Sequence, residues 1–129
     1  MAKKNPHHIN EKYDSNIIEA LLKIDCPIIG VEGIEFYVRD EARKERGIEH
    51  IAKKEHRLKV RDIESLPSIL RKPKYIIVDP HNRNYKNYYG IRKGDDPNAL
   101  LKIVTWPDEH NPKKELIITI FPTKSIKVD

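Results

Sequence analysis

The sequence predicts a single α+β domain in which N-terminal helices pack on a four-stranded antiparallel sheet. Apolar residues recur at helical spacing before Pro73, and afterwards they form short runs or alternate as in strands. The segments after Pro73 are joined by short connections, which favours antiparallel pairing because a parallel return needs a crossover of about a dozen residues. The length of 129 residues suits one domain, expected over residues 13–129 behind a polar, disordered tail over residues 1–12.

Three helical segments are expected in the first half of the chain. The first is capped by Asp14 or Ser15 and ends at Cys26-Pro27. Its apolar face is formed by Ile17, Ile18, Leu21 and Leu22. A charge-dense segment over residues 39–58 has helical propensity and breaks near Gly47. The third helix begins at Asp62 or Ser65 and stops at Pro73. Its apolar stripe consists of Ile63, Leu66, Ile69 and Leu70.

The expected strands begin with a short segment over residues 34–38. The continuous apolar run over residues 75–78 is typical of a central strand. The remaining strands are predicted over residues 85–93, 100–106 and 116–121. In the last of them, simple alternation turns Leu116, Ile118 and Ile120 toward the helices.

Composition excludes several classes of protein. No apolar run approaches the ~20 residues of a membrane helix, and the N-terminus lacks the apolar core of a secretory signal. One cysteine, Cys26, excludes an internal disulfide and a multi-thiolate metal site. We therefore expect a cytoplasmic protein with no cofactor, no metal and no membrane partner.

The net charge of +5 is concentrated in the middle of the chain. Residues 43–61 hold eight basic and three acidic side chains, and residues 71–93 hold seven basic side chains against Asp79 alone. A localised basic excess of this kind attracts polyanions, of which nucleic acid is the main class.

His50 and His56 are the candidate acid–base pair. Histidine can both accept and donate a proton near neutral pH. The spacing of six differs from the i, i+4 spacing with which one helix presents two histidines to a metal. On a straight helix the two rings would point roughly 120° apart.

Aromatic and basic residues alternate along residues 85–93. One face of this strand would present Lys86, Tyr88, Gly90 and Arg92. Such a face supplies a ring for base stacking, cations for phosphates and a glycine for close backbone approach. Thr119 places a hydroxyl in an otherwise apolar strand, where it needs a hydrogen-bond partner or faces a cleft.

Over residues 34–124 the sequence resembles the phage-associated branch of the barnase–EndoU–colicin–RelE-like nucleases. The resemblance is carried by the strand Phe36-Tyr37-Val38, by His50 with Lys54-Glu55-His56, by residues 66–73, and by Thr119-Ile120-Phe121-Pro122. It implies helices on a four-stranded antiparallel sheet and metal-independent RNA cleavage through 2′-hydroxyl attack, leaving a 2′,3′-cyclic phosphate. It also implies catalytic roles for His50, His56 and Thr119.

Charge distribution, candidate residues and resemblance together predict a metal-independent endoribonuclease, toxin-like or associated with a phage or mobile element. It would act on an RNA such as tRNA or mRNA. A cognate inhibitor or a protein of the same element would be a further partner. The residues expected to bind RNA or its phosphates are Lys53, Lys54, Lys86, Tyr88, Arg92, Lys93 and Lys124. Two alternatives stay open: a non-catalytic RNA- or DNA-binding module, and an accessory phage protein that docks an acidic partner.

Overall fold

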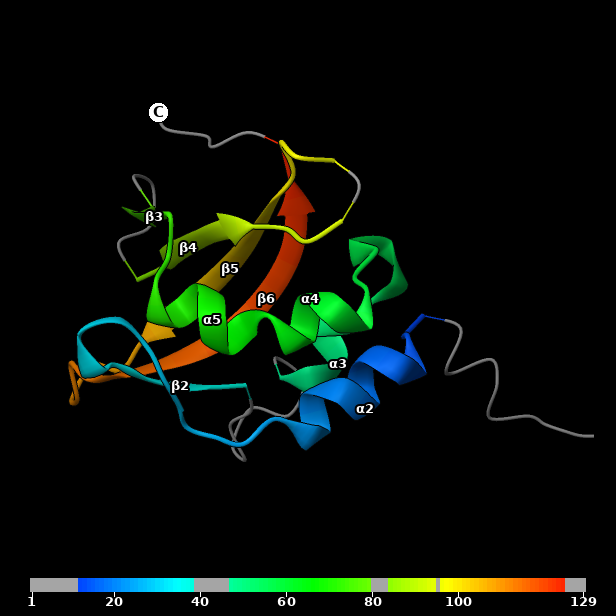
Figure 1. The fold of residues 1–129 in the computed structure, drawn as a ribbon. Coiled ribbons are helices and arrows are strands. Elements are labelled where there is room, and N and C mark those ends of the chain that lie inside the picture. The colour runs from blue at the N-terminus through cyan, green and yellow to red at the C-terminus, as the bar shows by residue number, and fades with distance from the viewer. Residues whose placement is uncertain (1–11, 39–46, 80–83, 95, 125–129) are drawn as a thin grey trace, which may run out of the picture.

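The computed structural model describes residues 12–38, 47–79, 84–94 and 96–124 (Figure 1). Most of the expected tail and residues 39–46 of the second predicted helix lie outside this part. The helical elements are α2 (Ser15–Lys23), η1 (Val31–Gly33), α3 (Ile48–Ile51), η3 (Lys54–His56), α4 (Val60–Glu64) and α5 (Leu66–Arg71). The strands are β1 (Ile28–Ile29), β2 (Glu35–Tyr37), β3 (Tyr75–Val78), β4 (Lys86–Ile91), β5 (Leu100–Pro107) and β6 (Lys114–Thr123).

The α+β class is confirmed, and β3, β4, β5 and β6 pair antiparallel in that order, but the sheet is larger than the four-stranded antiparallel sheet that the sequence predicts. The described residues form one six-stranded mixed sheet in the order β1-β2-β6-β5-β4-β3. Strand β2 runs parallel to β6, with Tyr37 opposite Leu116, and β1 extends the same edge. This pairing joins segments almost eighty residues apart. The lengths of the connections between neighbouring strands therefore gave no indication of it.

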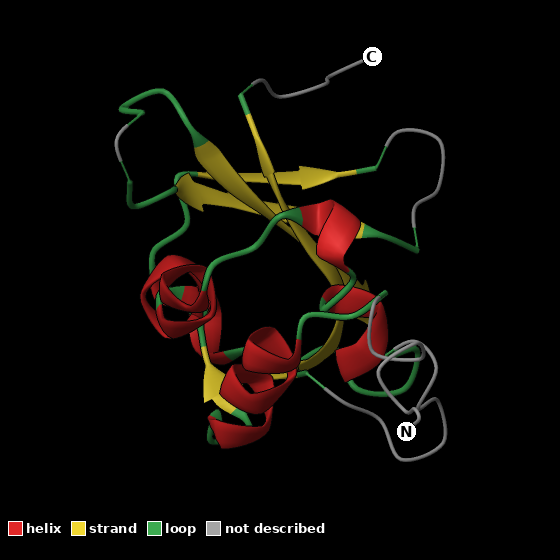
Figure 2. Ribbon diagram, turned by 90° about the vertical axis from the view of Figure 1, so that its right-hand side faces the viewer, coloured by secondary structure: helices red, strands yellow, loops and turns green. Residues whose placement is uncertain are grey.

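The helices gather on one side of the sheet, as Figure 2 shows. Asp14 caps α2, because its Oδ1 accepts hydrogen bonds from the backbone N–H groups of Asn16 and Ile17 at 2.9 and 3.3 Å. The predicted stripe on α4 and α5 is confirmed: its four members, Ile63, Leu66, Ile69 and Leu70, are all buried. Gly90 of β4 lies directly beneath α5, since a Cβ there would come within 2.6 Å of the Ile69 side chain. This contact identifies the sheet face that packs on the helices.

Strand β3 is an edge strand, and its prediction as a central strand is wrong. It pairs only with β4 in the sheet order. Tyr75, Ile76 and Val78 keep 43%, 41% and 53% of their surface exposed. An apolar run indicates a strand, but its position in the sheet depends on neighbours that the run does not encode.

The alternation predicted for β6 fails because the strand contains a β-bulge. Thr119 lies opposite Val104 and Ile117 lies opposite Thr105, so Ile118 is an extra residue without its own opposite number on β5. As a result Ile117 and Ile120 are fully buried, while Leu116 and Ile118 are only half-buried. Of the three residues predicted to face the helices, only Ile120 is buried.

This register gives a first testable prediction. Ile120→Ala should lower the free energy of unfolding by about 2–5 kcal/mol, because it leaves a cavity in the core. Ile118→Ala, with the same change in volume, should cost clearly less because its side chain is only partly buried. Urea unfolding of both variants measures the difference, and equal losses would contradict the bulge.

None of the helices in the described part of the chain is long and apolar enough to span a lipid bilayer.

Candidate nucleic-acid interface

The structure brings the rings of His50 and His56 together. Helix α3 ends at Ile51, and the chain then turns through Ala52 and Lys53 into η3. The ring centroids are consequently 5.6 Å apart, with the ring planes at 74°. An unbroken helix would have separated the two side chains, so it is the break that makes them neighbours.

The orientation of His56 is set by the backbone of α3. Its Nδ1 lies 3.1 Å from the carbonyl oxygen of Ile51. A carbonyl oxygen can only accept, so Nδ1 donates this hydrogen bond, and in the neutral ring Nε2 is left without a proton. The same ring lies 6.4 Å from the ring of Phe121 on β6. His56 is therefore positioned to present Nε2 as a proton acceptor.

Thr119 belongs to the same region of the fold. Strand β2 pairs with β6 as far as Leu116, and α3 and η3 also contact β6, with His56 beside Phe121. Thr119 is half-buried in this part of β6, two residues before the ring that contacts His56. The three predicted catalytic residues thus come from elements that pack on one another.

A cavity of about 400 Å³ lies between the start of α2, η3 and the end of β4. We call it the basic pocket, because five of its lining residues are basic and only Asp14 is acidic. Its lining consists of Asp14, Ile17, Lys53, Lys54, Arg57, Leu58, Lys59 and Arg92. The pocket brings together three predicted phosphate-binding residues, Lys53, Lys54 and Arg92, and its local excess of positive charge suits an anionic ligand.

Arg92 serves the fold as well as the pocket. Its Nε and Nη2 donate to the two carboxylate oxygens of Asp62 at 3.0 and 2.9 Å, and Nη2 also donates to the Arg57 carbonyl at 3.1 Å. The Asp62 side chain is 1% exposed and that of Arg92 is 20% exposed. The guanidinium therefore balances a buried carboxylate, and little of its charge is left for a phosphate.

The prediction that Tyr88 offers its ring to a base is wrong. Tyr88 is fully buried on the helix-facing side of the sheet, where its ring meets Phe36 edge-on. Its hydroxyl donates to Glu115 at 2.8 Å, and burial, followed by this hydrogen bond, raises the pKa of Tyr88. Lys86 lies on the same face and pairs with Glu115 at 3.1 Å. Thr105 also donates to this carboxylate, at 2.7 Å, so the group forms a buried polar network.

The other two predicted cations lie near the ends of their strands. Lys93 is exposed just after β4. Lys124 follows β6 and pairs with Asp96 at 3.3 Å, with 80% of its side chain exposed. Neither residue lines the basic pocket.

Sequence reasoning missed Arg57 and Lys59 as pocket residues, although both lie in the first basic segment and could have been added from charge alone. It also missed Phe121 and Lys102, which lie on the same sheet face as Thr119. Lys102 Nζ lies 5.2 Å from the Phe121 ring centroid. Alternation along residues 100–106 would have placed Lys102 and Trp106 on the same face of the strand. The cross-strand neighbours of Lys102 could be identified only from the strand register.

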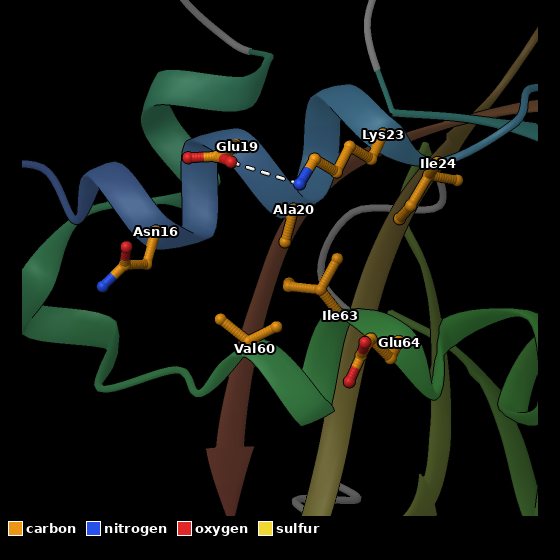
Figure 3. A pocket seen from close by; sticks show the side chains of 8 residues that line it. All are labelled: Asn16, Glu19, Ala20, Lys23, Ile24, Val60, Ile63 and Glu64. Atoms are coloured by element: carbon orange, nitrogen blue, oxygen red, sulfur yellow. Dashed lines mark ion pairs between the residues drawn. The ribbon is translucent and has the colours of Figure 1, made fainter.

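A second hollow, of about 410 Å³, lies between α2 and α4 (Figure 3). Ala20, Val60 and Ile63 point into the space between the two helices, and the ion pair of Glu19 with Lys23 at 3.1 Å lies on its rim. None of the predicted catalytic or RNA-binding residues lines it.

No three His, Cys, Asp or Glu side chains in the described residues are grouped closely enough to bind one metal ion. Searches against models of protein families, curated proteins and solved structures gave no match.

Proposed function

We propose that this protein binds RNA and cleaves it without a metal ion, producing a 2′,3′-cyclic phosphate end. The observation that carries the proposal is the pair of adjacent imidazoles, His50 and His56, one of which is held by Ile51 with its Nε2 as acceptor. Two neighbouring histidines supply the acceptor and the donor that transesterification of a phosphodiester requires.

In the proposed mechanism, His56 Nε2 removes the proton from a ribose 2′-hydroxyl. The 2′-oxygen then bonds to the adjacent phosphorus, and the bond from phosphorus to the 5′-oxygen of the next nucleotide breaks. Protonated His50 donates its proton to that leaving oxygen. Thr119 donates a hydrogen bond to the phosphate, and the basic pocket holds neighbouring phosphates through Lys54, Arg57 and Lys59, which are exposed.

The antiparallel strands β3 to β6 and the histidine pair support the further proposal that this chain belongs to the phage-associated branch of the barnase–EndoU–colicin–RelE-like nucleases. In that case β1 and the parallel β2 are additions to the four-stranded sheet that the resemblance implies. A second candidate function is RNA binding without cleavage. It is favoured by the basic pocket itself, because a cluster of exposed cations binds polyanions whether or not chemistry follows.

Incubation of the purified protein with mixed-sequence RNA in excess chelator tests the proposal. We expect cleavage, with products that carry cyclic phosphate ends. Intact RNA under these conditions would leave binding as the function.

The basic pocket gives a second testable prediction. The double charge reversal Lys54→Glu with Lys59→Glu should weaken RNA binding and flatten its salt dependence, by roughly 0.7 in the log–log slope for each lost phosphate contact with a single strand. The matched control is Lys23→Glu with Lys72→Glu, two exposed lysines that do not line the pocket. Fluorescence anisotropy across a salt series measures both, and equal losses would place the phosphate site elsewhere.

A further inference from the structure

A row of side chains crosses four strands on the sheet face turned away from α5. Cross-strand register places Tyr75 opposite Tyr89, Tyr89 opposite Lys102, and Lys102 opposite Phe121. We call these four residues the aromatic row. Gly90, the next residue after Tyr89, packs on α5, so the aromatic row lies on the opposite face.

Within the row, Lys102 forms cation–aromatic contacts with two of the rings. Lys102 Nζ lies 5.9 Å from the Tyr89 ring centroid and 5.2 Å from that of Phe121. Tyr89 is only 1% exposed and supports the row, whereas Tyr75 is 43% exposed and Phe121 and Lys102 are half-buried. Accessible rings beside an ammonium group are the combination that stacks bases and attracts the phosphates between them.

The row ends at the proposed catalytic pair. The Phe121 ring contacts His56, and His56 contacts His50. A nucleotide stacked on Phe121 would therefore have its ribose and phosphate beside the imidazoles and beside Thr119, which lies on the same strand. The arrangement links a base-binding surface to the position where the proton transfers are proposed.

A second aromatic contact lies on the same face. Trp106 is four residues after Lys102 on β5, and its ring centroid is 5.3 Å from that of Tyr85. Four residues of strand span about 13 Å. Tyr75 and Phe121 are three strand spacings apart, about 14 Å. Consecutive stacked bases are only about 3.4 Å apart, so rings this far apart suit bases that have been separated from one another.

We propose that this sheet face is the base-binding surface of the protein and that it selects single-stranded RNA, with bases stacked on Tyr75, Phe121 and Trp106. This inference rests on the proposed function, because it supplies the substrate class for the same site. It also replaces the face first predicted from the sequence, whose Tyr88 is buried.

Binding of a fully 2′-O-methylated RNA, which lacks the attacking hydroxyl, tests the inference separately from cleavage. Trp106 is the single tryptophan of the chain, so its emission reports on this face alone. We expect the single-stranded RNA to change the emission of Trp106 with the same midpoint as binding measured by anisotropy. A duplex of the same sequence and inorganic polyphosphate should leave the emission nearly unchanged.

A pair of neighbouring substitutions provides the matched control. Tyr75→Ala should weaken single-strand binding about tenfold. Ile76→Ala should leave it unchanged, because Ile76 has nearly the same exposure, 41%, on the other face of the same strand.

Three results would overturn the inference. Trp106 emission could stay constant at saturating RNA, or polyphosphate could change it as much as single-stranded RNA does. The third is equal RNA affinity of the Tyr75→Ala and Ile76→Ala variants. If RNA were still cleaved in any of these cases, only the proposed base-binding surface would be rejected. If bases stacked on this face but unmodified RNA were not cleaved, the nuclease proposal would be rejected and the base-binding surface retained.

Discussion

His56→Ala and His50→Ala are each expected to slow RNA cleavage by about 10²–10⁴-fold while RNA affinity stays nearly constant. A proton-transfer group stabilises the transition state and contributes little to ground-state binding, so the loss should appear in turnover. Single-turnover cleavage in chelator, with anisotropy on non-cleavable RNA, measures the two quantities. Parental rates in both variants would end the nuclease proposal.

Two controls separate chemistry from folding. His110→Ala removes an exposed histidine in the connection between β5 and β6 and should leave the rate unchanged. His56→Asn offers an amide N–H that can replace the donor to the Ile51 carbonyl but has no group to accept a proton. It should therefore be folded and inactive, and recovery of activity in this variant would indicate that His56 acts only through its backbone contact.

The pH dependence of cleavage provides an independent check. One histidine must be neutral and the other protonated, so the rate should fall on both sides of an optimum. Removal of either histidine should abolish one limb of the profile. A bell-shaped profile that survives in both alanine variants would assign the titration to other groups.

Arg92→Ala is expected to lower the free energy of unfolding by about 3–5 kcal/mol, because it leaves the Asp62 carboxylate, 1% exposed, without its bidentate partner. Urea unfolding measures this loss. Lys93→Ala, which removes the exposed neighbouring cation, is the control and should change stability by less than about 0.5 kcal/mol.

The double variant Arg92→Leu with Asp62→Asn removes both charges, keeps an oxygen that accepts the Lys59 backbone N–H, and should recover part of the stability lost in Arg92→Ala. A variant Arg92→Ala that is as stable as the parent but binds RNA poorly would contradict the structural role. It would restore the sequence-based interpretation, in which Arg92 is a phosphate clamp.

Local chemistry in the sequence was sufficient to predict much of the framework. Polar residues before an apolar helical repeat predicted a cap at Asp14 or Ser15, and Asp14 is the cap. The spacing of apolar residues predicted the buried stripe from Ile63 to Leu70. Pro73 marked the change from helix to strand because proline cannot continue a helix, and α5 ends two residues before it. Each of these features depends on residues within one or two turns of one another.

The site was only partly predictable. Charge density indicated the basic segment that lines the pocket, and residue type indicated His50 and His56. Their contact could not be read from spacing, because it depends on where α3 ends and how η3 folds back. Arg92 and Lys86 look like free cations in the sequence, and their carboxylate partners lie 30 and 29 residues away.

Tertiary structure alone decided which sheet face meets the helices. A period of two divides a strand into two sets of side chains but does not say which set is buried, and one extra residue reverses the assignment. The bulge at Ile118 exchanges the faces within β6, and the packing of α5 on Gly90 buries Tyr88 and leaves Tyr75, Lys102 and Phe121 on the other side. The parallel pairing of β2 with β6 ends at Leu116, and the packing of α3 and η3 on β6 brings His56 to Phe121. These arrangements arise from contacts between segments far apart in the chain, for which the local pattern of residues holds no information.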